Sequence, residues 1–138
     1  MSTTVNRERF VTGMTGVYFV AAELSAKGYV VTTTARNAPG IDIMASTPDL
    51  KRTFNIQVKA NKVGGTQAYW LLDKNANRTE SANLLYVFVN LKENAKPDFY
   101  IVPSHVVAKN VEHSRAKNSE WWSFHRDNKY KDRWDLFS

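Results

Sequence analysis

Apolar and polar residues follow a helical period in the first part of the chain. From residue 6 to residue 27 apolar side chains recur every three or four positions, which is the spacing of one helix face. The residues of this predicted face are Phe10, Met14, Val17, Tyr18, Ala21 and Leu24. Gly28 follows them directly and predicts the end of the helix, because glycine readily takes the left-handed conformation that closes one.

Strand patterns dominate the rest of the chain, with β-branched and aromatic residues or a strict alternation of apolar and polar positions. The segments that predict strands are 29–35, 41–46, 53–60, 84–91 and 98–103. The segment LLYVFVNL, residues 84–91, is apolar on both faces and is therefore expected at the centre of a covered sheet.

The order of these elements predicts the fold class. Residues 66–83 have a mixed pattern, with an extended piece around AYWLL and a short helix near RTESA, and a second helix is expected over 104–110. A long N-terminal helix followed by three strands, a mixed segment, two strands and a helix indicates an α/β protein. We expect a mixed central sheet of about five strands flanked by helices.

The chain length of 138 residues predicts one domain, residues 1–138, with one core. The polar segment 110–120 is predicted to be a surface loop. The aromatic and charged segment after it is expected to pack onto the domain through its tryptophans. Together, residues 110–138 are interpreted as a C-terminal docking tail, which a partner protein would contact.

Composition narrows the classes of function. The chain has no cysteine, which excludes disulfides, thiolate zinc sites and thiol nucleophiles. The net charge of +6 favours a polyanionic partner such as a nucleic acid. No apolar run is long enough for a membrane span, and the first ten residues lack the apolar segment of a signal peptide, so a cytoplasmic protein without membrane contact is expected.

Polar residues interrupt two of the predicted strands. In TFNIQVKA, Gln57 and Lys59 share one face while Ile56 and Val58 share the other, because side chains alternate along a strand. If this strand pairs with IDIMAS, Asp42 can lie on the face of Gln57 and Lys59. The pattern therefore predicts a carboxylate, an amide and an amine in one cluster.

This cluster suits metal-assisted cleavage of phosphodiesters. The carboxylate of Asp42 and the amide oxygen of Gln57 are hard ligands for Mg²⁺ or Mn²⁺, with the backbone carbonyl of Val58 as a third. The metal would polarise the phosphate and lower the pKa of a bound water, and Lys59 would orient that water or offset charge on the phosphate. Arg36 and Lys62 lie in the flanking turns and are the candidate nucleic-acid contacts.

The motifs around these residues resemble the PD-(D/E)XK nuclease superfamily. The resemblance covers residues 13–62, with GVYFVAAELSAKGYVV, then GIDIMA, then IQVKANK, and Gln in place of the acid before x-Lys matches a known variant. It is similar to the branches that include restriction endonucleases and Holliday-junction resolvases, and to small uncharacterised bacterial members. The resemblance implies a restriction-endonuclease-like fold and a metal-dependent endonuclease acting on DNA, with Asp42, Gln57 and Lys59 as the active-site set.

One position departs from the family pattern. Many relatives have a Gly-Glu pair in the first helix whose Glu joins the metal site, whereas this chain has Gly16-Val17. Glu23 is the nearest acid, but six residues at about 100° each place it roughly 240° around the helix from Val17. A site with Asp42 as its clear carboxylate predicts weak metal binding.

Three alternatives stay open from the sequence. The polar residues can be solvated surface groups on an edge strand, and Asp73, Lys74 and Arg78 can be a solvated loop or a phosphate contact, of which the loop is favoured. The chain can be a non-catalytic binding module on a degenerate nuclease fold. It can also be an interaction protein, either as a homodimer or with a partner protein on its tail.

The three histidines of the chain, His105, His113 and His125, lack the spacing of metal ligands.

Overall fold

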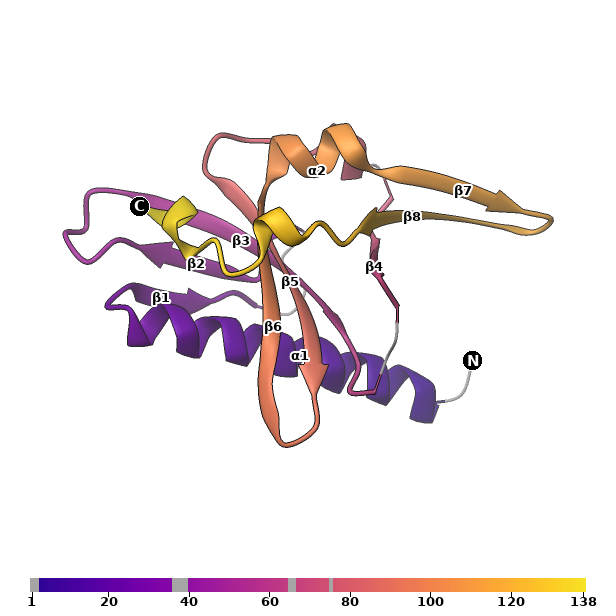
Figure 1. Ribbon diagram of the computed structural model, residues 1–138, viewed down its shortest axis with the longest axis horizontal. Helices are drawn as coiled ribbons and strands as arrows, with labels where there is room; N and C mark the ends of the chain where they lie inside the picture. The colour runs from indigo at the N-terminus through magenta and orange to yellow at the C-terminus, as the bar shows by residue number, and fades with distance from the viewer. Residues whose placement is uncertain (1–2, 36–39, 65–66, 75) are drawn as a thin grey trace.

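A mixed sheet of five strands, in the order β1-β2-β3-β5-β6, forms the centre of the molecule (Figure 1). The structure is a computed structural model and describes residues 3–35, 40–64, 67–74 and 76–138. The strands are β1 (Val30–Thr33), β2 (Ile43–Ser46), β3 (Thr53–Asn61), β5 (Leu84–Lys92) and β6 (Ala95–Pro103). β3 and β5 run parallel, and the other neighbouring pairs are antiparallel. β3 is therefore the middle strand, with a neighbour on each side.

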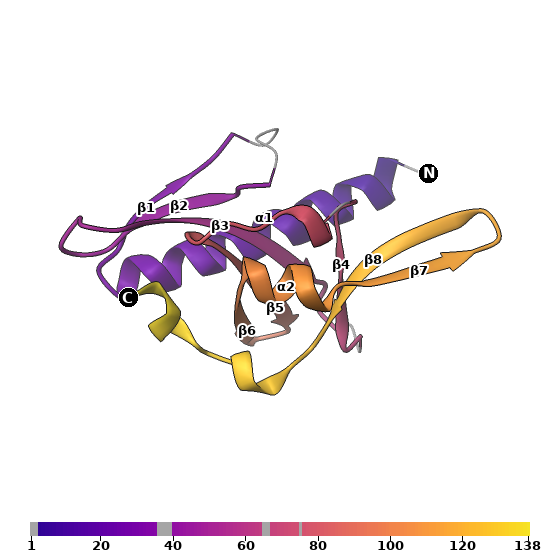
Figure 2. The same ribbon diagram turned by 90° about the horizontal axis from the view of Figure 1, so that it is seen from above.

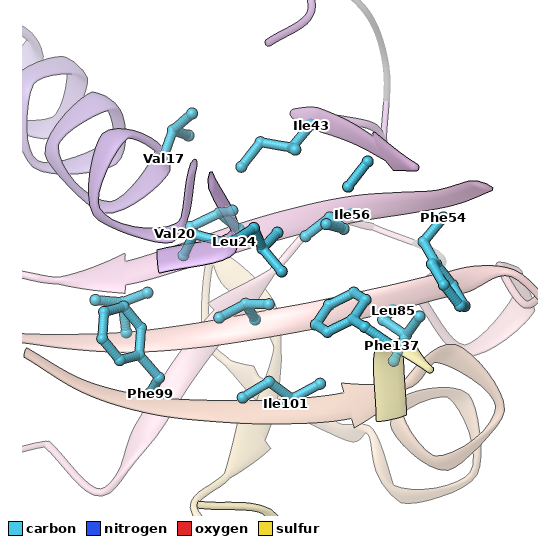
Figure 3. Packing of buried hydrophobic residues seen from close by; sticks show 14 of the residues in the cluster. Val17, Val20, Leu24, Ile43, Phe54, Ile56, Leu85, Phe99, Ile101 and Phe137 are labelled. Atoms are coloured by element: carbon cyan, nitrogen blue, oxygen red, sulfur yellow. The ribbon is translucent and has the colours of Figure 1, made fainter. Parts of the chain in front are cut away.

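Helix α1 (Thr3–Ala26) covers one face of this sheet (Figure 2). Its buried residues are Gly16, Val17, Val20 and Leu24, and they pack on sheet residues such as Ile43 and Ile56 (Figure 3). The predicted helix face is thus partly wrong, since Phe10 is 45% exposed and Tyr18 is 61% exposed. No helix in the described part of the chain is long and apolar enough to cross a membrane.

A second, smaller sheet and helix α2 (Ser104–Asn110) cover the other face. This sheet has the order β4-β8-β7, with β4 (Tyr69–Leu72), β7 (Glu112–Ala116) and β8 (Ser119–His125). The buried side chains between the layers include Trp70, Phe88, Tyr100 and Phe124. The predicted α/β fold with a mixed five-stranded sheet and a long N-terminal helix is confirmed.

The segment predicted to be a surface loop, residues 110–120, is instead largely strand. β7 and β8 pair antiparallel, with His113 opposite Trp122. They form a hairpin that projects from the body at the end where α1 begins (Figures 1 and 2). The polar composition that suggested a loop belongs to a ribbon exposed on much of its surface.

The last turn, just before the exposed Ser138, packs into the main core. The short 3₁₀ turns of the chain are η1 (Ala76–Arg78) between β4 and β5, and η2 (Asn128–Tyr130) and η3 (Trp134–Phe137) after β8. In η3, Phe137 is completely buried and packs against the rings of Phe54 and Tyr29. Figure 3 shows Phe137 next to Phe54 in the core. Deleting residues 119–138 would remove β8 and this aromatic anchor together. Such a deletion therefore tests folding before it tests docking.

Candidate active site

The middle strand of the sheet carries a row of polar side chains. On β3, Ile56 and Val58 point into the core beneath α1, so Gln57 and Lys59 point to the opposite face. The Gln57 side chain is not solvated, because the residue is only 6% exposed. The interpretation of Gln57 and Lys59 as the open face of an edge strand is therefore wrong.

Asp42 lies one residue before β2, where this strand diverges from β3. The predicted pairing of the two strands is confirmed, with Ile43 opposite Ile56. The backbone N–H of Asp42 donates to the Ile56 carbonyl at 2.8 Å, and its carboxylate Oδ2 accepts from the Val58 N–H at 2.7 Å. The pairing of β2 with β3 ends at Ile43 and Ile56, so the Val58 N–H has no carbonyl of β2 opposite it. The Asp42 carboxylate accepts its hydrogen bond instead.

A second carboxylate, which the sequence analysis did not assign to the site, joins this cluster. Asp73 follows β4 directly; its Oδ2 accepts from Gln57 Nε2 at 2.8 Å, and its Oδ1 lies 3.1 Å from Lys59 Nζ. Asp73 is a loop residue with 68% of its side chain exposed, as the favoured interpretation predicted, but its two contacts also connect it to this cluster. A signal was present in YWLLD, because an acid follows a strand in which Trp70 and Leu72 are the buried alternate residues.

The charges around Asp73 fix its ionisation. Partial loss of hydration acts to raise the pKa of the Asp73 carboxyl, but the charge of Lys59 and the hydrogen bonds from Gln57 and Lys59 outweigh it and leave the pKa below its usual value. Burial, reinforced by the negative charge of Asp73, raises the pKa of the nearby Tyr86 to about 12. At neutral pH Asp73 is therefore ionised and Tyr86 is neutral.

These side chains share one open cleft with a volume of about 920 Å³. Asp42, Gln57, Lys59 and Asp73 all line it. α1 forms the facing wall with residues that include Glu8, Arg9 and Val17. The structure therefore brings the three predicted site residues together, and adds Asp73 to them.

The two predicted nucleic-acid contacts have different outcomes. Lys62 is exposed and lines the cleft just beyond the end of β3. Arg36 lies outside the described residues.

Glu23 does not supply the missing helix acid. Its side chain is 16% exposed and forms ion pairs with Lys27 at 3.9 Å and Lys96 at 2.5 Å. It is not among the cleft residues. Val17 does line the cleft, and it is 6% exposed. The α1 position that carries an acid in the family pattern thus faces the cleft with a valine.

The donor chemistry of the cleft fits a hard divalent cation. Within the described ranges, no three His, Cys, Asp or Glu side chains group so that they could hold a metal ion. A metal would depend on a mixed set: the Asp42 carboxylate, the Gln57 amide oxygen and a backbone carbonyl. Such oxygen donors are the ligands that Mg²⁺ and Mn²⁺ prefer.

Two of the solved structures that share this fold are nucleases. The bacterial homing endonuclease I-Ssp6803I is 16% identical with a TM-score of 0.56, over 98% of this chain and 90% of that one. Hjc, a Holliday junction resolvase from Archaeoglobus fulgidus, is 15% identical with a TM-score of 0.52, over 86% of each chain. The chain therefore has the fold of these two structures, and the fold that the PD-(D/E)XK resemblance implied is confirmed.

Comparison by sequence adds no closer relative. No family model matches the chain, and no curated protein matches it.

Proposed function

We propose that the chain is a metal-dependent nuclease acting on DNA, with Asp42, Gln57 and Lys59 as its active-site set. The observation that carries this proposal is one cleft, on a fold shared with nucleases, which is lined by a carboxylate from the residue before β2 and by an amide and an amine from β3. The net charge of +6 supports a polyanionic substrate.

The proposed metal ligands come from a short stretch of backbone. Asp42 Oδ2 accepts from the Val58 N–H, which holds the carboxylate beside β3 in the cleft. The N–H and C=O of one residue in a strand point to the same edge, so the Val58 carbonyl is directed to the side of Asp42. Gln57 Oε1 completes the set. When bound, Mg²⁺ or Mn²⁺ would supply positive charge that polarises a phosphate.

Lys59 would act on the substrate side of the cleft. Its side chain is 21% exposed, and its ammonium lies 3.1 Å from Asp73 Oδ1 on the wall of the cleft. An ammonium in this place stabilises negative charge that grows on the phosphate and orients the attacking water. Lys62, further along the same wall, would contact a neighbouring phosphate.

The test is cleavage of plasmid, linear and branched DNA with Mg²⁺ or Mn²⁺. We expect Asp42→Ala and Lys59→Ala each to lower the rate by about 100-fold or more, in the range of single catalytic groups. Asp98→Ala and Lys92→Ala are matched controls, because this pair lies 3.1 Å apart outside the cleft. Equal cleavage by wild type and both cleft variants would contradict the proposal.

A second candidate function is DNA binding without cleavage. The observation that favours it is Val17, which lines the cleft where the family pattern has an acid. It predicts salt-dependent DNA binding by wild type with no metal-dependent turnover. Turnover that depends on Asp42 and Lys59 would rule it out.

A further inference from the structure

We infer that Asp73 is a positioning residue of this site, which selects the end of the Gln57 amide that faces the metal. The inference rests on the proposed function. It starts from the two contacts of Asp73: Oδ2 accepts from Gln57 Nε2 at 2.8 Å, and Oδ1 lies 3.1 Å from Lys59 Nζ. Both proposed site residues on the polar face of β3 are thus held by one carboxylate.

The orientation of the Gln57 amide follows from the chemistry of its partner. An amide has a donor end and an acceptor end, whereas an ionised carboxylate only accepts. Asp73 therefore binds the NH₂ end and leaves the oxygen end for another partner. A metal ion takes the oxygen and rejects the NH₂, so the rotamer that Asp73 favours is the rotamer that a metal requires.

The same contact explains why an amide suits position 57. A glutamate there would place two carboxylates within hydrogen-bond distance, and like charges at this distance disfavour ionisation of one of them. With Gln57 the pair is complementary, and the negative charge is kept at Asp73. The chain therefore has its second acid at the end of β4 rather than on β3.

The strand that precedes Asp73 is anchored in the core. The preceding strand β4 is anchored by Trp70, which is 1% exposed and donates its indole N–H to the Val89 carbonyl at 3.0 Å. Asn61 of β3 donates to the Tyr69 carbonyl at 2.8 Å and so ties β4 to the strand of Gln57. These two contacts fix the end of β4 beside β3, and the Asp73 carboxylate, 68% exposed, reaches Gln57 and Lys59 from there.

Asp73 acts through its neighbours rather than as a ligand. Each of its oxygens has a protein partner, Gln57 for one and Lys59 for the other. Its loss would free the amide to turn its NH₂ end towards the cleft. It would also remove the charge that holds the Lys59 ammonium.

A double-mutant cycle on the full chain tests the inference, with Mn²⁺ alone as the probe in isothermal titration. We expect Asp73→Asn to weaken Mn²⁺ binding by about 10-fold or more, because an asparagine can donate to the amide oxygen and turn it away from the metal. In a Gln57→Leu background, which has no amide to orient, Asp73→Asn should cost less than about 2-fold.

Two controls separate this role from general charge and folding effects. Asp98→Asn removes an equal charge from a carboxylate that also lies 3.1 Å from a lysine, and should leave Mn²⁺ binding within about 2-fold. In ¹⁵N spectra without metal, the Gln57 NH₂ protons should exchange slowly in wild type and faster in Asp73→Asn, while the backbone signals away from the cleft stay unchanged.

The outcomes distinguish this inference from the proposed function. If Asp73→Asn lowers Mn²⁺ affinity equally in the wild-type and Gln57→Leu backgrounds, the effect is one of charge and positioning is overturned. An Mn²⁺ affinity that Asp73→Asn leaves unchanged would also overturn positioning. Wild type that shows the expected coupling but cuts no DNA would overturn the nuclease proposal alone. Metal-dependent cleavage together with an Asp73→Asn affinity equal to wild type would overturn positioning alone.

Discussion

At the scale of single residues, Val17 lies on the boundary between the core and the cleft. It packs in the cluster beneath α1 and also lines the cleft of Asp42. A glutamate at this position could keep its methylene groups in the core and place only its carboxylate in the cleft. One substitution at position 17 can therefore raise metal affinity and lower the stability of the fold.

We predict that Val17→Glu raises Mn²⁺ affinity by about 10-fold, since it adds a carboxylate ligand beside Asp42. The free energy of unfolding without metal should fall by about 2–3 kcal/mol, because a buried valine side chain is lost. Mn²⁺ should restore part of that loss. Calorimetric titration and urea unfolding measure the two effects, and Val17→Gln is the matched uncharged control. Equal Mn²⁺ affinity in the Glu and Gln variants would contradict the prediction.

The grouping of Gln57 and Lys59 in the cleft could be predicted from the alternation of side chains along a strand. Alternation places Gln57 and Lys59 on one face because Ile56 and Val58 are needed in the core. Asp73 was not predictable in this way. The YWLLD pattern indicates an acid after a strand, but the contact of this acid with Gln57 depends on where β4 lies, and β4 pairs with β8 far along the chain.

At the scale of elements, the packing of α1 on β3 depends on Gly16. A Cβ atom at Gly16 would lie 2.7 Å from the Cβ of Ala60, so the helix approaches the strand as closely as a glycine allows. Gly13, one turn earlier, has nothing within 4 Å of the same ideal position. The two glycines of one helix therefore have different roles.

Substitution of these glycines by alanine should change stability in opposite directions. We predict that Gly16→Ala lowers the free energy of unfolding by about 1–2 kcal/mol, because overpacking outweighs the gain in helix propensity. Gly13→Ala should raise it by about 0.5–1 kcal/mol. Urea unfolding of both variants gives the comparison. A stabilised Gly16→Ala protein would show that the helix can move away from β3 without cost.

The existence of α1 was predictable, but its buried face was only partly so. Apolar residues surround the helix: Tyr18 and Phe10 are exposed, while Val17 and Val20 are buried. A periodicity cannot select a face when several faces are apolar. The close approach of Gly16 to Ala60 helps to determine which face of α1 is buried. This contact could not be predicted without the position of β3.

At the scale of the whole molecule, the central sheet was predictable from the order of its elements, and the second sheet was not. Residues 84–91 are apolar on both faces, and the structure covers both of them, with α1 on one side and β4, β8 and α2 on the other. The ribbon of β7 and β8 is polar, so its local pattern resembled a loop. β7 pairs with β8, and β8 pairs in turn with β4.

The net charge of +6 predicts the response of DNA binding to salt. If Lys62 at the cleft contacts a phosphate, Lys62→Ala should weaken binding and reduce the slope of log K against log salt by about 1, as expected for one lost phosphate contact. Lys51→Ala is the matched control, because Lys51 lies in the turn between β2 and β3 and is not among the residues that line the cleft. Fluorescence anisotropy between about 50 and 200 mM salt gives the slopes. Equal slopes for both variants would mean that DNA does not follow the cleft past Lys62.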